Sequence, residues 1–177
     1  GVVMERAARD IPLKEGDGQF CIAARPDDGL ELSTCAAFSC NGDGADLWDD
    51  FLSDGRLEDG PGYRAGPGDH LAGAVCVKTR LEPGESRTAV LSLAWDLPLI
   101  RFGGGREHWR RHTRHFDRSG TNAAAIAQEA LERADEWSRA ADAWHQSVLD
   151  ANPNRPDSLF SLLFNETYIA VDGLTVW

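Results

Sequence analysis

Apolar positions follow two different periods along the chain, and the change comes near residue 104. Before it, short β-prone runs alternate with clusters of Pro, Gly, Asp and Asn that are typical of turns. These runs cover residues 18–24, 30–40, 72–81 and 87–95. Several short strands at this spacing predict part of an antiparallel β-sandwich over 1–103, with at least its first strands missing.

The segment between the last two runs contains Pro83-Gly84, which favours a tight turn. The two flanking runs are therefore predicted to form an antiparallel hairpin. We expect Trp95, at the end of the second run, to be buried, with Asp96 capping the turn that follows.

A short amphipathic helix is predicted over 46–55, ending at Gly55. One side of it is apolar and is expected to dock on the sandwich. This side consists of Leu47, Trp48, Phe51 and Leu52.

After Gly105 the apolar residues recur at steps of three or four, which predicts a long helix. Its apolar face consists of Ile126, Ala130, Ala134, Trp137, Ala141, Trp144 and Val148. Thr121 is expected to cap it, and the prolines of 152–156 end it. A second helix is predicted over 158–170. Two such helices need partners to bury their apolar faces, so we expect the chain to be an internal piece of a longer protein.

The chain is acidic, with a net charge of -11 and a pI near 4.8. This charge disfavours nucleic acid and anionic membranes as main partners. No apolar run reaches the ~18 residues of a spanning helix, so no transmembrane segment is predicted, while peripheral membrane contact stays open.

The four cysteines form no C-x-x-C pair; they are Cys21, Cys35, Cys40 and Cys76. Zinc sites favour short paired spacings, so a zinc site is the weaker alternative. Buried free thiols in a reducing cytoplasm are the favoured interpretation.

Residues 101–118 are locally basic, with six arginines against two acidic residues. A helical step would place His108, His112 and His115 on roughly one face, which is compatible with a metal site. No H-E-x-x-H motif and no acidic ligand accompany them. Phosphate or nucleic-acid contact is a second alternative. A solvated or ion-paired linker helix over 104–120 is the preferred interpretation.

Glu166 lies between Phe164 and Tyr168 in an apolar run, and Asp172-Gly173 is expected to form a turn after it. An ionised carboxylate among aromatic residues is costly to desolvate unless it is paired or takes part in chemistry. The ordinary alternative is a helix residue that faces solvent.

Residues 163–177 closely resemble the Phe-Asn-Glu-Leu-Tyr…Asp-Gly-Gly-Thr-Val-Trp segment of glycoside hydrolase family 116. This is the family of the non-lysosomal glucosylceramidase and the bile-acid β-glucosidase. Two positions depart from the family pattern: Thr167 replaces Leu, and Leu174 replaces Gly. Weaker matches occur in the family's order at 18–20, 48–51, 53–57, 71–74, 81–85, 95–98 and 108–116.

The resemblance implies a fragment of a retaining β-glucosidase that acts on β-glucosides or glucosylceramide-like glycolipids, without a cofactor. Glu166 would be the catalytic nucleophile, Asn165 and Tyr168 would orient it, and Asp172 would bind a sugar hydroxyl. The acid/base residue would lie beyond Trp177, so the fragment alone is expected to be inactive.

The implied domains are the end of a β-sandwich (1–103), the basic linker (104–120) and the first helices of an (α/α)6 barrel (121–177). The rest of that helical domain would be the chain's main partner. A non-catalytic alternative is a carbohydrate-binding sandwich with a helical interaction tail. Its aromatic platforms would be Tyr63, Trp48 and Trp95.

Overall fold

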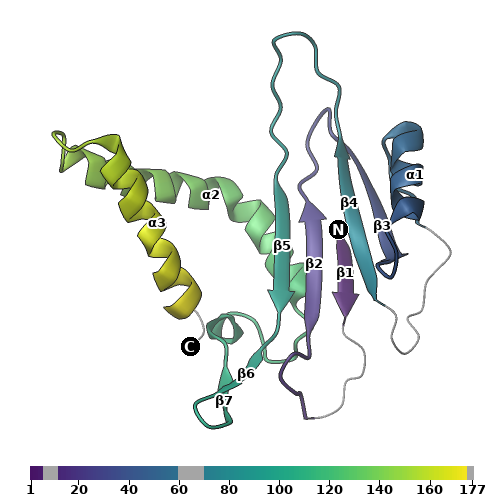
Figure 1. The fold of residues 1–177 in the computed structure, drawn as a ribbon, viewed down its shortest axis with the longest axis horizontal. Helices are drawn as coiled ribbons and strands as arrows, with labels where there is room; N and C mark the ends of the chain where they lie inside the picture. The colour runs from purple at the N-terminus through teal and green to yellow at the C-terminus, as the bar shows by residue number, and fades with distance from the viewer. Residues whose placement is uncertain (6–11, 60–69, 175–177) are drawn as a thin grey trace.

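A computed structural model describes residues 1–5, 12–59 and 70–174, with side chains except at 5, 46, 102 and 166–174. Strands fill the first part of the chain and two long helices the last (Figure 1). The elements are β1 (Val2–Glu5), β2 (Gln19–Ala24), β3 (Glu31–Ser39), α1 (Ala45–Asp54), β4 (Leu71–Lys78), β5 (Leu91–Asp96), β6 (Leu99–Phe102), β7 (Arg106–Trp109), the 3-10 helix η1 (Arg111–Arg114), α2 (Ala123–Asp150) and α3 (Asp157–Leu174). The change from strand to helix follows the change of period in the sequence.

All strand pairs are antiparallel, in sheets ordered β1-β2-β5, β3-β4 and β6-β7. The predicted hairpin of 72–81 with 87–95 is wrong, because β4 pairs with β3 and β5 pairs with β2. The expected turn does form, and the Glu85 amide donates to the Glu82 carbonyl over 2.9 Å. It lies within a long connection from one sheet to the other (Figure 1). A local turn thus does not determine which strands pair on either side of it.

The two larger sheets meet where β1 lies against β4. Val2 is only 5% exposed, and a Cβ added to Gly73 would lie 2.5 Å from Val2 Cγ1. The Gly73 amide also donates to Met4 Sδ over 3.1 Å. Glycine is therefore required at position 73 for this close contact between the sheets.

Helix α1 lies beside β3 and β4 and ends, as predicted, at Gly55, whose φ of 74° is left-handed (Figure 1). Leu47 and Phe51 are partly buried and line a hollow with Val75 of β4. The expected docking face is only partly used, since Trp48 is 55% exposed and Leu52 is 73% exposed.

Helix α2 covers one face of the β1-β2-β5 sheet with small side chains. Its Ala123 and Ala127 are fully buried against Cys21, Ala23 and Ala94, and Ile126 and Leu131 pack at the margin. Alanines on both surfaces allow the helix and the sheet to approach closely. The helix then runs away from the sheets (Figure 1).

The predicted apolar face of α2 is only partly covered, since Trp137 and Trp144 are 45% and 48% exposed. Helix α3 folds back toward α2 at this end (Figure 1). Phe164 packs on Trp144 and on His145, with ring centroids 5.4 and 4.2 Å apart. Aromatic contacts therefore join the two helices near the connection between them.

The linker differs from the prediction of a helix over 104–120. Gly103, Gly104 and Gly105 all have positive φ and form the turn between β6 and β7. Three glycines favour such a turn and disfavour a helix at this point. The next segment is the strand β7, and η1 is the only helical turn of the linker within the described residues.

Two further helix boundaries differ from expectation. The residue preceding α2 is Asn122 instead of Thr121. Helix α3 continues to Leu174, so the turn expected at Asp172-Gly173 is not formed. Within the described part of the chain, none of the helices has the length and apolar character needed to cross a bilayer.

Candidate functional site

A buried carboxylate lies where the sandwich meets the helices. Asp96, the last residue of β5, is 0% exposed. Its Oδ1 lies 2.8 Å from His112 Nε2 in η1. Its Oδ2 accepts hydrogen bonds from the backbone amide of Asn122 (2.8 Å) and from Asn122 Nδ2 (3.0 Å). Burying an ionised carboxylate is tolerated only when hydrogen bonds replace its water, and these three do so.

Asp96 connects three elements: β5 that carries it, η1 through His112, and the start of α2 through Asn122. The amino end of a helix favours a negative charge nearby, so Asp96 is well placed beside α2. The Asn122 side chain does not cap α2, because its amide group is shared between two carboxylates, those of Asp96 and Asp117. The arrangement fixes the direction in which α2 leaves the sandwich.

Asp117 accepts from Asn122 Nδ2 over 2.9 Å and from the Ser119 amide over 2.8 Å. Hydrogen bonds, first from Asn122 and then from Ser119, lower the pKa of Asp117 to about 2. The carboxylate therefore stays ionised at any physiological pH.

A hollow of about 360 Å³ lies beside this network. It is lined by Trp95, Arg110, Arg111, His112 and His115. Contrary to the prediction, Trp95 is 51% exposed. Exposed and buried residues alternate along β5, and Trp95 is on the exposed side while Asp96 is on the side of α2. The hollow thus combines an aromatic ring with basic groups.

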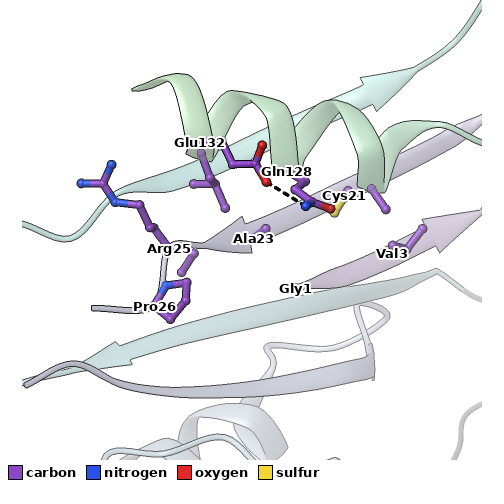
Figure 2. A pocket seen from close by; sticks show the side chains of 11 residues that line it. Gly1, Val3, Cys21, Ala23, Arg25, Pro26, Gln128 and Glu132 are labelled. Carbon is purple, nitrogen blue, oxygen red and sulfur yellow. Dashed lines mark hydrogen bonds between the residues drawn. The ribbon is translucent and has the colours of Figure 1, made fainter. Parts of the chain in front are cut away.

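A second pocket, of about 470 Å³, lies between α2 and β2 (Figure 2). Gln128 of α2 donates to Glu132 over 2.8 Å in its wall. Cys21 also lines it, and burial raises the pKa of the Cys21 thiol, which keeps it protonated and unreactive. Glu132 is the single acidic residue among those lining this pocket, so they provide no pair of carboxylates for glycoside hydrolysis.

The site residues predicted from the sequence all belong to α3. Asn165 is exposed. The side chains of Glu166, Tyr168 and Asp172 lie outside the described residues, and only their helical backbone is placed. Their catalytic and binding roles therefore stay predictions.

The histidine cluster is not formed as a helix face. His108 is on β7, His112 is in η1, and His115 follows η1. Among the residues that the structure describes, no group of three or more His, Cys, Asp or Glu side chains could hold a metal ion.

All four cysteines are free thiols. Cys21 and Cys35 are buried as expected, and Cys76 is partly buried. Cys40 is exposed, contrary to the expectation of buried thiols, because it directly follows the end of β3.

Two of the aromatic platforms of the non-catalytic alternative, Trp48 and Trp95, lie on different elements. Trp48 is on α1, beside the β3-β4 sheet, while Trp95 is on β5 in the other sheet (Figure 1). Tyr63 lies outside the described residues.

The chain matches a family model described as "beta-glucosidase 2, glycosyl-hydrolase family 116 N-term". The match spans residues 1–137, out of 177 in the chain. It includes both sandwich sheets, the Asp96 network and the part of α2 that packs on the sheet. It ends within α2, where the helix has left the sandwich.

Proposed function

The chain belongs to glycoside hydrolase family 116, and we propose that the full-length protein is a retaining β-glucosidase. Its substrates would be β-glucosides, including glucosylceramide-like glycolipids. The observation that carries the proposal is the family match, whose description names a β-glucosidase. The likeness of residues 163–177 to the family's Phe-Asn-Glu segment lies outside the matched range and supports it separately.

In a retaining mechanism one carboxylate attacks the anomeric carbon while a carboxylic acid ~5–5.5 Å away protonates the leaving oxygen. We assign the nucleophile to Glu166, and the acid/base to a residue of the helical domain outside this chain. Asn165 and Tyr168 would orient Glu166, and Asp172 would bind a hydroxyl of the glucose. Because water must complete the second step, the same acid/base would then deprotonate that water.

In this proposal the sandwich acts as the base of the catalytic domain. Helices α2 and α3 would be the first pair of an (α/α)6 barrel, and the Asp96 network would fix where that pair begins. The exposed Trp137 and Trp144 of α2 would pack against later helices. A cytoplasmic location stays a prediction.

The decisive experiment is covalent trapping in the full-length protein. A 2-deoxy-2-fluoro-β-glucoside slows release of the glycosyl-enzyme, so peptide mapping identifies the carboxylate that carries the sugar. We expect the label on Glu166. A label on another carboxylate would refute the assignment of Glu166 but keep the retaining mechanism, while an inverted product and no label would refute the mechanism.

Rescue by a small anion gives an independent test. Glu166→Ala is expected to lower kcat by several orders of magnitude with little loss of folding stability. Azide should restore part of the turnover of an activated aryl glucoside and give the α-glucosyl azide. Asp142→Ala, at an exposed position of α2, is a matched control and should keep its activity. Equal loss in both variants would contradict a catalytic role for Glu166.

A further inference from the structure

The hollow beside Trp95 has a composition unlike the rest of this acidic protein. The chain carries a net charge of -11, yet the residues that line the hollow are two arginines, two histidines and one tryptophan. No acidic residue is among them. Asp96 lies behind His112 and is 0% exposed, so its carboxylate is not presented at the surface of the hollow.

Arg110 is held in place by its backbone, whose amide donates to the Pro98 carbonyl over 2.9 Å. Its Nε is buried and has no hydrogen-bond partner among the described residues. A buried donor without an acceptor costs ~1–3 kcal/mol, so this guanidinium is poised for an acceptor from outside.

Several other arginines of the protein have carboxylate partners. Arg101 pairs with Glu107 over 2.6 Å, and Arg133 pairs with both Glu129 and Glu136. Within the described part of the chain, neither Arg110 nor Arg111 has a carboxylate partner. The two guanidinium groups at the hollow are therefore available for an anion.

Trp95 adds a second kind of recognition. Its indole is 51% exposed, which leaves a large apolar surface beside the arginines. An indole is a good platform for the C–H face of a pyranose ring, and a guanidinium recognises carboxylate or phosphate through paired hydrogen bonds. His112 is fixed by its contact with Asp96, which orients its ring at the wall of the hollow.

We propose that this hollow is a binding site for a hexose that carries an anionic group, either a carboxylate or a phosphate. The sugar ring packs on Trp95, and the anionic group binds Arg110 and Arg111. Its volume, about 360 Å³, is in the range of small-molecule sites. The inference does not rest on the proposed glucosidase activity, since none of these residues is assigned to that reaction.

The test is calorimetric titration of the full-length protein with four probes: glucuronate, glucose 6-phosphate, glucose and inorganic phosphate. At least one anionic hexose is expected to bind at least about tenfold more tightly than both glucose and inorganic phosphate. Comparison of glucuronate with glucose 6-phosphate distinguishes the two anionic groups. If neither anionic hexose binds at concentrations up to about 20 mM, the proposal is refuted.

Two variants test which residue binds the anionic group of the ligand and which binds its sugar ring. Arg110→Gln should weaken the anionic hexose at least about tenfold and leave glucose unchanged. Trp95→Ala should weaken the hexose about fivefold and leave inorganic phosphate unchanged. Matched controls are Arg80→Gln, whose side chain is 93% exposed, and Trp48→Ala on α1. Equal affinities in all four variants would overturn the assignment of the site.

The main alternative to a bound ligand is that an acidic side chain of the full-length protein itself pairs with Arg110 and Arg111. If Arg110→Gln lowers the unfolding temperature of the full-length protein and no anionic hexose binds, the hollow holds an acidic side chain of the protein, and the proposal is wrong. Glu166→Gln should leave binding of the anionic hexose unchanged, so failure of the nucleophile assignment does not affect this result.

Discussion

Removing the carboxylate of Asp96 should be among the most damaging single changes in the sandwich. Asp96→Ala deletes three hydrogen bonds to a buried charge, those with His112 Nε2, the Asn122 amide and Asn122 Nδ2. Hydrogen bonds to charged groups contribute ~1.5–3 kcal/mol each. The His112 side chain is 26% exposed and regains water, so the two bonds from Asn122 account for most of the loss. The expected destabilisation is about 3–5 kcal/mol.

The assay combines urea unfolding of the full-length protein with hydrogen exchange. Unfolding measures the change in free energy, while exchange over residues 119–127 reports on the start of α2 directly. The matched control is Asp142→Ala, since Asp142 is exposed and has no hydrogen bond among the described residues. Asp96→Asn keeps the shape and should cost less than Asp96→Ala, because the amide oxygen still accepts from Asn122. If Asp96→Ala and Asp142→Ala lower stability equally, the network does not hold α2, and the reasoning is wrong.

Three other predictions follow from described contacts. Gly73→Ala should destabilise the sandwich by about 1–3 kcal/mol in the same unfolding assay, because the new methyl group meets β1 at the contact between the sheets; unchanged stability would contradict that contact. Asn122→Ala should raise the pKa of Asp117 from about 2 toward 3.8, measured by NMR titration of its carboxyl carbon. Because the folded pKa is the lower one, Asp117 contributes stability above pH 3.8 that is lost as the pH falls toward 2, and the variant should lose less over this window. Iodoacetamide should alkylate the exposed Cys40 well before the buried Cys21, as followed by mass spectrometry of the native protein; the reverse order would contradict the burial of Cys21.

Much of the secondary structure could be predicted from local pattern. The helix ending at Gly55 and the long helix before 152–156 were predicted because caps, prolines and apolar periods act within a few residues. Pairing of β4 and β5 could not be predicted in this way. Although the turn between them forms as expected, β4 pairs with β3 and β5 pairs with β2. These partners are distant in sequence, and a local pattern does not identify them.

The Asp96 network shows why the site was only partly predictable. The sequence indicated that Asp96 follows a strand, but its partners His112 and Asn122 lie 16 and 26 residues further on. They meet it only because the β6-β7 hairpin brings the chain back past the end of β5, whereas the sequence predicts a helix from residue 104 onward. Apolar alternation along β5 places Leu91, Leu93 and Trp95 on one side of the strand and predicts that this side is buried, whereas the structure leaves all three exposed and buries the opposite side under α2.

Helix α2 acts mechanically as a lever, because only its first part, from Ala123 to Leu131, is packed on the sandwich. The part beyond Leu131 extends for 19 residues, or ~28 Å at 1.5 Å per residue. A ~2° tilt of the packed part of α2 would move the far end of the helix by ~1 Å. This displacement exceeds the ~0.5 Å within which catalytic side chains must be positioned. Substitutions among the small residues beneath α2 would therefore be amplified along the helix and displace α3, so sandwich variants far from any sugar could change turnover without touching substrate.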